Sequence, residues 1–268
     1  GVSMRYSAAA IQMDCILGDY EANMAKAERM VEEAVSKGAK LIVLPELFST
    51  GFRLDERYYE FAEHIPNGNT VRKLEQWAKA WNVYIVGCIV EHGAISGIVH
   101  DTAMLVGPSG YIGKHRKMNP WWQEKLYFKP GGDFSVFDTP LGRLGIAICY
   151  EGGFPEISRQ LAIKGADLII VPSAFGKARL YAWEIFTRAR ALENGCFLIA
   201  ANRCGEEKGV AFAGHSRIVN PQGAVKAELA AGDGVILADV DLEEVARQRR
   251  NIPYLLDLRT DLFSYSNN

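Results

Sequence analysis

The chain has 268 residues, of which 49% are hydrophobic and 23% charged, and 30 Lys and Arg against 32 Asp and Glu give a formal net charge of −2. This balance is typical of a soluble globular protein and excludes collagen-like and disordered chains. Near-neutral charge argues against a nucleic-acid binder. No apolar run approaches the ~20 residues that cross a bilayer, so we expect no membrane association.

Five cysteines occur at wide, irregular spacing, and none forms a CxxC pair. This pattern gives little support for a disulfide framework, a zinc ribbon or a thioredoxin motif. The five histidines show no HxH or HExxH spacing, so we expect neither a metal nor an organic cofactor. A reducing cytoplasm is the predicted compartment.

The first half of the chain alternates strand and helix patterns. A strand predicted at 6–13 precedes an amphipathic helix at 23–37, where apolar residues recur at helical spacing. A buried strand follows at 40–44, and a second helix at 70–81 has Thr70 as its predicted N-cap. Further strands are predicted at 83–91, at 102–106 and, after a turn at 107–110, up to Lys114.

The second half continues this alternation. A hairpin is predicted from strands at 134–138 and 143–149, and a helix from Pro155 to Lys164 begins with a proline suited to its first turn. The remaining predictions are a strand at 167–171, a helix at 181–194, a strand at 196–201, a hairpin around 220–223, and a polar, Arg-rich tail at about 241–268 after a final short helix. No linker divides the chain, so we expect one domain over 1–268.

Two segments of the sequence, 37–46 and 164–173, resemble each other. Each contains a helix end, a Gly-Ala pair, a short apolar strand and a proline. Strands that are apolar throughout belong inside layered α/β folds. The repeat therefore predicts two packed sheets related by approximate symmetry. Glu46 and Ser173 then occupy matching positions beyond the ends of buried strands, where α/β proteins often bind ligands.

Three residues at predicted strand ends are candidates for chemistry. Burial would raise the pKa of Glu46 toward that of a general base. The Cys149 thiol precedes a glycine-containing turn whose N–H groups could face an oxyanion. A buried Lys117 would stabilise the negative charge of a Cys149 thiolate and of a tetrahedral oxyanion. Each also has a simpler interpretation. Glu46 could be a salt-bridged or exposed loop glutamate, Cys149 a small core residue, and Lys117 part of a solvated basic patch.

Together, the motifs around these residues resemble the nitrilase superfamily of carbon–nitrogen hydrolases. The motifs are found in the family's order at 44–48 (LPELF), 111–117 and 148–156. The resemblance extends over nearly the whole chain, from 8–13 to 259–263. It implies a four-layer α-β-β-α sandwich of two mixed sheets flanked by helices.

The resemblance also implies roles for individual residues. Glu46 corresponds to the family's general base, Lys117 to its oxyanion-stabilising lysine and Cys149 to its nucleophile. Glu124 lies seven positions after Lys117, where many members have a second glutamate that holds the lysine and orients the substrate. A surface salt bridge to Lys125 is the alternative for Glu124.

The residue after Cys149 indicates the branch of the superfamily. The sequence Cys149-Tyr150-Glu151 looks more like the amidase branches than the Cys-Trp-Glu of true nitrilases. We therefore expect hydrolysis of a small aliphatic or ω-amide to a carboxylate and ammonia through a cysteine thioester. An N-carbamoyl amidohydrolase or a nitrilase is the closest alternative. A non-catalytic binding protein or a redox-thiol protein is the alternative from another class.

Residues for substrate binding and assembly follow less directly. Arg179 or Arg203 is a candidate to bind a substrate carboxylate, and family members commonly form dimers, here expected to use the C-terminal tail. Candidate substrate-binding residues, each of which could equally be buried core, are Phe52, Trp121, Trp122, Tyr150, Ser173 and Phe175.

Overall fold

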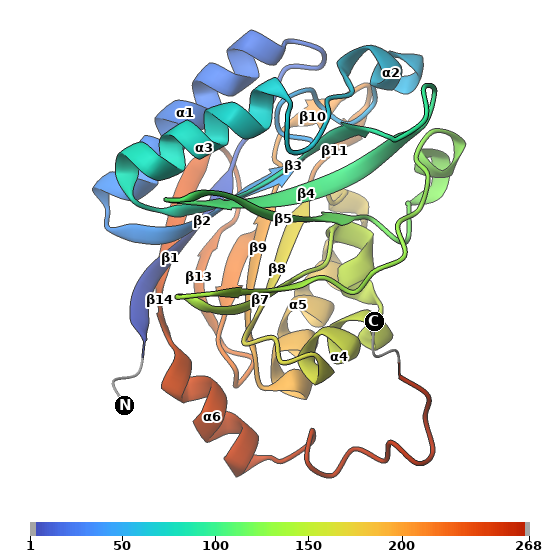
Figure 1. Cartoon of the computed structure of the whole chain (residues 1–268). Coiled ribbons are helices and arrows are strands. Elements are labelled where there is room, and N and C mark those ends of the chain that lie inside the picture. Colours follow the sequence, from blue (N-terminus) through green and yellow to red (C-terminus); the bar gives the residue numbers. More distant parts are fainter. Residues whose placement is uncertain (1–3, 266–268) are drawn as a thin grey trace.

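A computed structural model describes residues 4–265 as two six-stranded mixed sheets between helices (Figure 1). The first sheet has the order β14 (Gly234–Asp241), β1 (Arg5–Gln12), β2 (Ala39–Glu46), β3 (Tyr84–His92), β4 (Val99–Gly107) and β5 (Gly110–Arg116). The second has the order β13 (Val225–Leu229), β12 (Ser216–Val219), β9 (Phe197–Asn202), β8 (Leu168–Ser173), β7 (Gly142–Ile146) and β6 (Val136–Thr139).

The two sheets follow the same plan. Each has three parallel strands at its centre, β1-β2-β3 in one and β7-β8-β9 in the other. Two antiparallel strands extend each trio on one side, and a single antiparallel strand extends it on the other. The strands β2 and β8, which carry the repeated sequence, are the middle strands of the two trios. The predicted pair of related sheets is confirmed.

Helices cover the outer faces of both sheets. Figure 1 shows α1 (Tyr20–Ser36) and α3 (Asn69–Trp81) together on one side, with α4 (Pro155–Ile163) and α5 (Leu180–Asn194) over the other sheet. In β2, Leu41 and Val43 pack between the sheets, whereas Ile42 and Leu44 pack against α1 and α3. Both faces of this strand are therefore apolar, and burying each side chain contributes ~1.5–3 kcal/mol. The α-β-β-α sandwich is the predicted fold.

Two helix starts differ from the prediction. Helix α1 begins at Tyr20, three residues early, because the Asp19 side chain accepts a hydrogen bond from the Ala22 N–H. Helix α3 begins at Asn69 with Gly68 as its N-cap, so the prediction of Thr70 as N-cap is wrong. Thr70 is buried inside the helix, and its N–H and hydroxyl both donate to the Glu63 carboxylate.

The second half also differs in three places. Strand β7 ends at Ile146, so Cys149 lies in a 3-10 turn, η3 (Cys149–Gly153), rather than in the predicted strand. Strand β14 was not predicted. It pairs with β1, which lies near the other end of the sequence. The last helix, α6 (Leu242–Asn251), lies inside the segment expected to be tail, and residues 266–268 of that segment lie outside the described residues.

The shorter elements lie mostly in loops near the ends of the central strands. These short elements are η1 (Asp55–Arg57), α2 (Tyr58–Phe61), η2 (Trp122–Leu126), η4 (Lys177–Arg179), β10 (Glu206–Glu207) and β11 (Val210–Ala211).

None of the helices within residues 4–265 is both long and apolar enough to span a bilayer.

Candidate active site

The four residues predicted to carry catalysis lie together. Glu46 is the last residue of β2, Lys117 directly follows β5, Glu124 lies in η2 and Cys149 begins η3. All four side chains are almost completely buried, with residue exposures between 1% and 5%. Glu46 ends β2 of the first sheet and Cys149 follows β7 of the second, so the packing of the two sheets against each other brings these residues, distant in sequence, together.

The Lys117 ammonium connects the two glutamates. Its Nζ donates to Glu46 Oε2 and to Glu124 Oε1, each at 2.8 Å. Burial alone would lower the pKa of Lys117, but the surrounding carboxylates raise it well above its ordinary value. Burial opposes ionisation of Glu46, but the charge of Lys117 and hydrogen bonds to Glu46 outweigh it and lower the pKa of Glu46. At neutral pH the pair is therefore ionised. The rise in the pKa of Glu46 expected from the sequence is wrong, because the sequence did not show that Lys117 pairs with Glu46.

Glu124 responds differently to the same environment. Burial, together with the negative charge of Glu46, raises the pKa of Glu124 to about 7, and Lys117 only partly offsets this. Glu124 is buried, and its Oε1 accepts a hydrogen bond from Lys117 rather than from Lys125. The predicted alternative of a surface salt bridge is therefore not what the structure contains.

The Cys149 thiol lies beside the Glu46 carboxylate in a strained turn. Cys149 has φ +51°, a left-handed conformation that costs a non-glycine residue about 1–3 kcal/mol. Burial, followed by the charge of Glu46, raises the pKa of Cys149 well above that of a free thiol. The resting cysteine is thus a neutral thiol beside the Glu46 carboxylate. The Ala174 N–H, just beyond β8, donates to the other oxygen of Glu46 at 3.2 Å.

Glu151 links the turn that carries Cys149 to the segment that carries Lys117. Its carboxylate accepts from the N–H of Ile148 at 3.0 Å and from the N–H of Met118 at 2.9 Å. It also lies 2.9 Å from the His115 imidazole. The buried Glu151 side chain therefore holds both Ile148, which precedes Cys149, and Met118, which follows Lys117. No sequence pattern indicated this role for Glu151 beyond its place in the motif.

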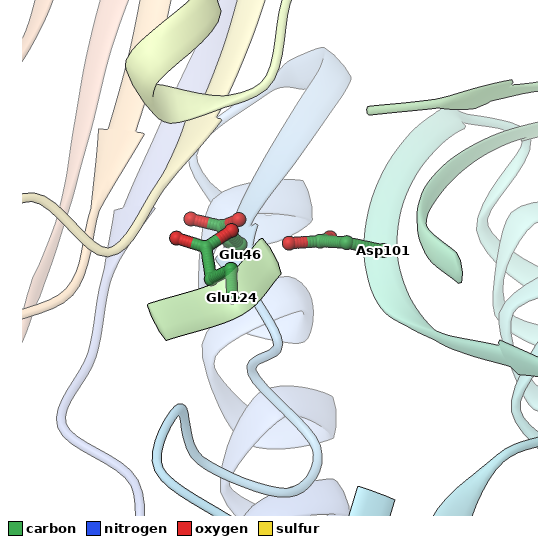
Figure 2. A group of neighbouring side chains, drawn as sticks. All are labelled: Glu46, Asp101 and Glu124. Carbon is green, nitrogen blue, oxygen red and sulfur yellow. The ribbon is translucent and has the colours of Figure 1, made fainter. Parts of the chain in front are cut away.

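Asp101, on β4, is a further buried carboxyl of this site, beside Glu46 and Glu124. No sequence motif indicated it. Carboxyl oxygens of Glu46, Asp101 and Glu124 lie within 4.8 Å of one another (Figure 2), a spacing at which carboxylates could hold a metal ion. The Lys117 ammonium, however, donates to two of these groups and lies 3.9 Å from Asp101 Oδ2. A cation thus already stands among the oxygens, and the donor set does not suit a metal.

Two adjoining cavities open beside these residues. The thiol cavity, of about 180 Å³, is lined by Cys149, Tyr150, Gly153, Phe175 and Phe186, among others. A neighbouring cavity of about 200 Å³ is lined by Glu124 together with Phe52, Tyr58, Trp122, Tyr127 and Phe212, among others. The two share Trp121, Ala174, Gly176 and Arg179.

Most of the predicted substrate-binding residues line these cavities. Phe52, Trp121, Tyr150 and Phe175 do so, with the Trp121 and Tyr150 ring centroids 4.8 Å apart. Ser173 does not line either cavity, because it is completely buried and its hydroxyl donates to the Val171 carbonyl. Ser173 matches Glu46 in the repeated sequence, but it is the N–H of the neighbouring Ala174 that donates to the Glu46 carboxylate.

The two arginine candidates have different surroundings. Arg203 is buried, with its guanidinium bonded to Glu207, Asp14 and the Cys15 carbonyl. It lines neither cavity. Arg179 is exposed, lines both cavities and lies over the Trp121 ring at 4.9 Å. Of the two, only Arg179 can meet a ligand in these cavities.

Two related sheets between helices, with glutamate, lysine and cysteine grouped at strand ends, define a hydrolase of the nitrilase type. The sequence pattern described as carbon-nitrogen hydrolase matches residues 7–250. The chain therefore belongs to the carbon-nitrogen hydrolase family and is an enzyme of that family.

Individual relatives cover nearly the whole chain. A nitrilase of Pyrococcus abyssi is 38% identical over 91% of this chain and 92% of its own. The human omega-amidase NIT2 is 33% identical over 98% of this chain and 97% of its own. The crystal structure of Saccharomyces cerevisiae Nit3, of branch 10 of the nitrilase superfamily, matches with a TM-score of 0.89 and 28% identity over 95% of this chain and 96% of its own.

Proposed function

We propose that this protein hydrolyses a small aliphatic or ω-amide to a carboxylate and ammonia through a thioester on Cys149. The observation that carries the proposal is the buried contact of a neutral thiol with an ionised glutamate, beside a fixed ammonium and at the wall of a cavity. These are the groups that acyl transfer through a cysteine requires.

In the first half-reaction, the Glu46 carboxylate takes the thiol proton while the Cys149 sulfur attacks the amide carbonyl carbon. Negative charge develops on the carbonyl oxygen, where the Lys117 ammonium and the Tyr150 N–H stabilise it. Glu46 then gives its proton to the amide nitrogen. The C–N bond breaks, ammonia leaves, and the acyl group stays on the sulfur as a thioester.

In the second half-reaction, water replaces ammonia in the cavity. Glu46 takes a proton from the water while the water oxygen attacks the thioester carbonyl carbon. The C–S bond then breaks, Glu46 returns the proton to the sulfur, and the product leaves as the carboxylic acid, which releases its own proton to water to become the carboxylate. Glu124 holds Lys117 in place through both half-reactions, since it accepts a hydrogen bond from the same Nζ.

The size and lining of the cavities support a small substrate with a second polar group. Cavities of about 180 and 200 Å³ admit only a few non-hydrogen atoms beyond the amide. Arg179 stands at the wall shared by both and can bind a carboxylate. We therefore favour an amide whose other end is a carboxylate, and omega-amidases are among the relatives.

Ammonia release tests this proposal. The purified chain is assayed with simple aliphatic amides, monoamides of short dicarboxylic acids, nitriles and N-carbamoyl compounds, with Cys149→Ala as the matched control. The proposal predicts turnover of amides by the wild-type chain and none by the variant. Turnover confined to nitriles would support the activity named for the Pyrococcus relative instead. Turnover confined to N-carbamoyl compounds would support the carbamoyl alternative.

We also propose that two copies of the chain pair in the cytoplasm. Tyr181 and Ile185, one turn apart on α5, are each 68% exposed, and Leu256 in the tail is 83% exposed. Figure 1 shows the chain after α6 as a long loop at the lower edge of the molecule. A second copy covering these apolar side chains is the partner we expect. Light scattering of wild type and Ile185→Glu tests this, and a monomeric wild type contradicts it.

A further inference from the structure

The proposed mechanism leaves Asp101 without a role, although it lies among the reacting groups. Figure 2 shows its carboxyl pointing from β4 toward Glu46 and Glu124. Its residue exposure is 1%. Oδ1 accepts a hydrogen bond from the Cys88 thiol at 3.2 Å, whereas Oδ2 accepts from no donor among residues 4–265.

The charges in this space do not balance if every carboxyl is ionised. Glu46, Asp101 and Glu124 would contribute three negative charges against the single positive charge of Lys117. A net charge of −2 in a site closed to water is strongly unfavourable, so carboxyls in such a site retain protons.

The hydrogen bonds indicate which carboxyl retains a proton most firmly. Glu46 accepts from the Lys117 ammonium and from the Ala174 N–H. Glu124 accepts from Lys117 through Oε1, while its Oε2 has no partner among residues 4–265. Asp101 has only a thiol donor on one oxygen, and its Oδ2 lies 3.9 Å from Lys117 Nζ. An ionised Asp101 would therefore hold an anionic oxygen to which no group among residues 4–265 donates a hydrogen bond.

We propose that Asp101 stays protonated in the working enzyme and, as a neutral donor through Oδ2, positions the Glu46 carboxylate and keeps it ionised. This inference rests on the proposed role of Glu46 as general base. Asp101 is thus a positioning residue that acts through Glu46. Its protonated form uses both oxygens, because Oδ1 accepts from Cys88 while Oδ2–H donates.

The ionisation preferences agree with this assignment. Burial, followed by the negative charge of Glu46, raises the pKa of Asp101 well above its ordinary value. The titratable groups that face Asp101 are Glu46 from β2, Cys88 from β3, Lys117 after β5, Glu124 from η2 and Tyr58 from α2. Among these groups, the Lys117 ammonium and the Cys88 thiol, which donates to Oδ1, favour ionisation of Asp101, and they do not outweigh burial and the charge of Glu46.

Two substitutions of nearly the same shape separate the possible states. Asp101→Asn keeps an acceptor for Cys88 and an N–H donor for Glu46, so it copies the protonated acid. Asp101→Leu keeps the branching at Cγ but removes the donor. A hydrogen bond to a charged carboxylate lowers its pKa, so losing the donor raises the pKa of Glu46. If Asp101 were instead an anion, either substitution would remove a negative charge and lower the pKa of Glu46.

The test follows alkylation of Cys149 by iodoacetamide across pH, read by mass on the Cys149 peptide of the full chain. Glu124 supplies an inflection near 7 in all forms, so the lower inflection reports Glu46. We expect no shift in Asp101→Asn and an upward shift of about one to two pH units in Asp101→Leu, the effect of one hydrogen bond to a charged group. A downward shift in both variants, or no shift in Asp101→Leu, overturns the proposal.

Infrared difference spectra give a second readout that needs neither turnover nor the Leu variant. Above pH 7, where Glu124 is largely ionised, wild type should retain a protonated-carboxyl band that Asp101→Asn lacks. Absence of that band in wild type overturns the proposal. Both readouts are independent of amide hydrolysis, so a chain that fails the ammonia assay but retains the band refutes the proposed function alone.

Discussion

The Lys117 ammonium and the Glu46 carboxylate lie 2.8 Å apart, although 71 positions separate them in the sequence. Both side chains are closed to solvent. Each therefore depends on the other for its charge, because a buried ion without its partner is strongly destabilising. In the proposed mechanism the Lys117 ammonium also stabilises the oxyanion, so stability and the proposed chemistry would use one ion pair.

Replacing Lys117 by Met should destabilise the fold by about 3–5 kcal/mol at neutral pH, because ionised Glu46 and Glu124 lose their shared cation. Part of the loss should return in acid, where these carboxyls take up protons. Urea unfolding at two pH values measures both effects. Lys114→Met is the matched control, since its buried partner Glu91 also pairs with Arg116. A Lys117→Met chain as stable as wild type at neutral pH would contradict this ion pair's importance.

The elevated pKa of Glu124 predicts a pH effect on activity. Above about 7 the carboxylate is ionised and holds Lys117 against Glu46. Below that pH it is protonated, and Lys117 has one anionic partner fewer. We expect kcat/KM to rise with pH through an inflection near 7, and Glu124→Gln to lack this inflection at a reduced rate. An unchanged inflection in that variant would assign it to another group.

The same shift predicts how Glu124 affects stability. Between its ordinary pKa of 4.5 and about 7, the folded chain keeps a proton that the unfolded chain has released. The contribution of Glu124 to stability therefore falls as pH rises through this window. Urea unfolding of wild type and Glu124→Gln should show a smaller decline across this window for the variant. A decline of equal size in both would argue against the shift.

Glu151→Gln should reduce activity by about tenfold or more with a stability loss of about 1–3 kcal/mol. The glutamine NH₂ would face an N–H donor, either that of Met118 or that of Ile148, which now meets a carboxylate oxygen. The steady-state rate and the urea midpoint are the measurements. Glu156→Gln, on the first turn of α4, is the control and should leave both unchanged. Full activity in Glu151→Gln would show that the link does not position the thiol.

Arg179→Ala should separate charged from neutral substrates. A charge-assisted hydrogen bond is worth about 1.5–3 kcal/mol, so kcat/KM for a carboxylate-bearing amide should fall about 10- to 100-fold. A simple aliphatic amide should be little affected. Lys177→Ala is the control, because Lys177 lies in the same short helix but lines neither cavity. Equal losses for both substrates would mean that Arg179 shapes the cavity rather than binding a carboxylate.

Local sequence patterns predicted most of this fold because its central strands are buried on both faces. The apolar runs in β2 and β8 and the helical periodicity of α3 are visible without tertiary information. Glu46 and Cys149 were recognisable because they follow such runs and belong to family motifs. Strand β14 was missed because it is only half buried, and its pairing partner β1 lies at the other end of the chain.

Tertiary contacts decided the residues that sequence patterns placed wrongly or overlooked. Thr70 has the side chain of an N-cap, but Glu63 from the preceding loop binds it instead. Asp101 is one polar residue within a strand, and nothing local indicates that it faces Glu46. Ser173 matches Glu46 in the repeat, but its short side chain bonds to its own strand.

The mass of the protein during turnover tests the central claim most directly. The wild-type chain is mixed with excess amide substrate, quenched in acid and weighed intact and after digestion. We predict a species heavier by the acyl group, with the added mass on the Cys149 peptide and its removal by hydroxylamine. An acyl group on another residue, or turnover by a Cys149→Ala chain, would contradict the thioester mechanism.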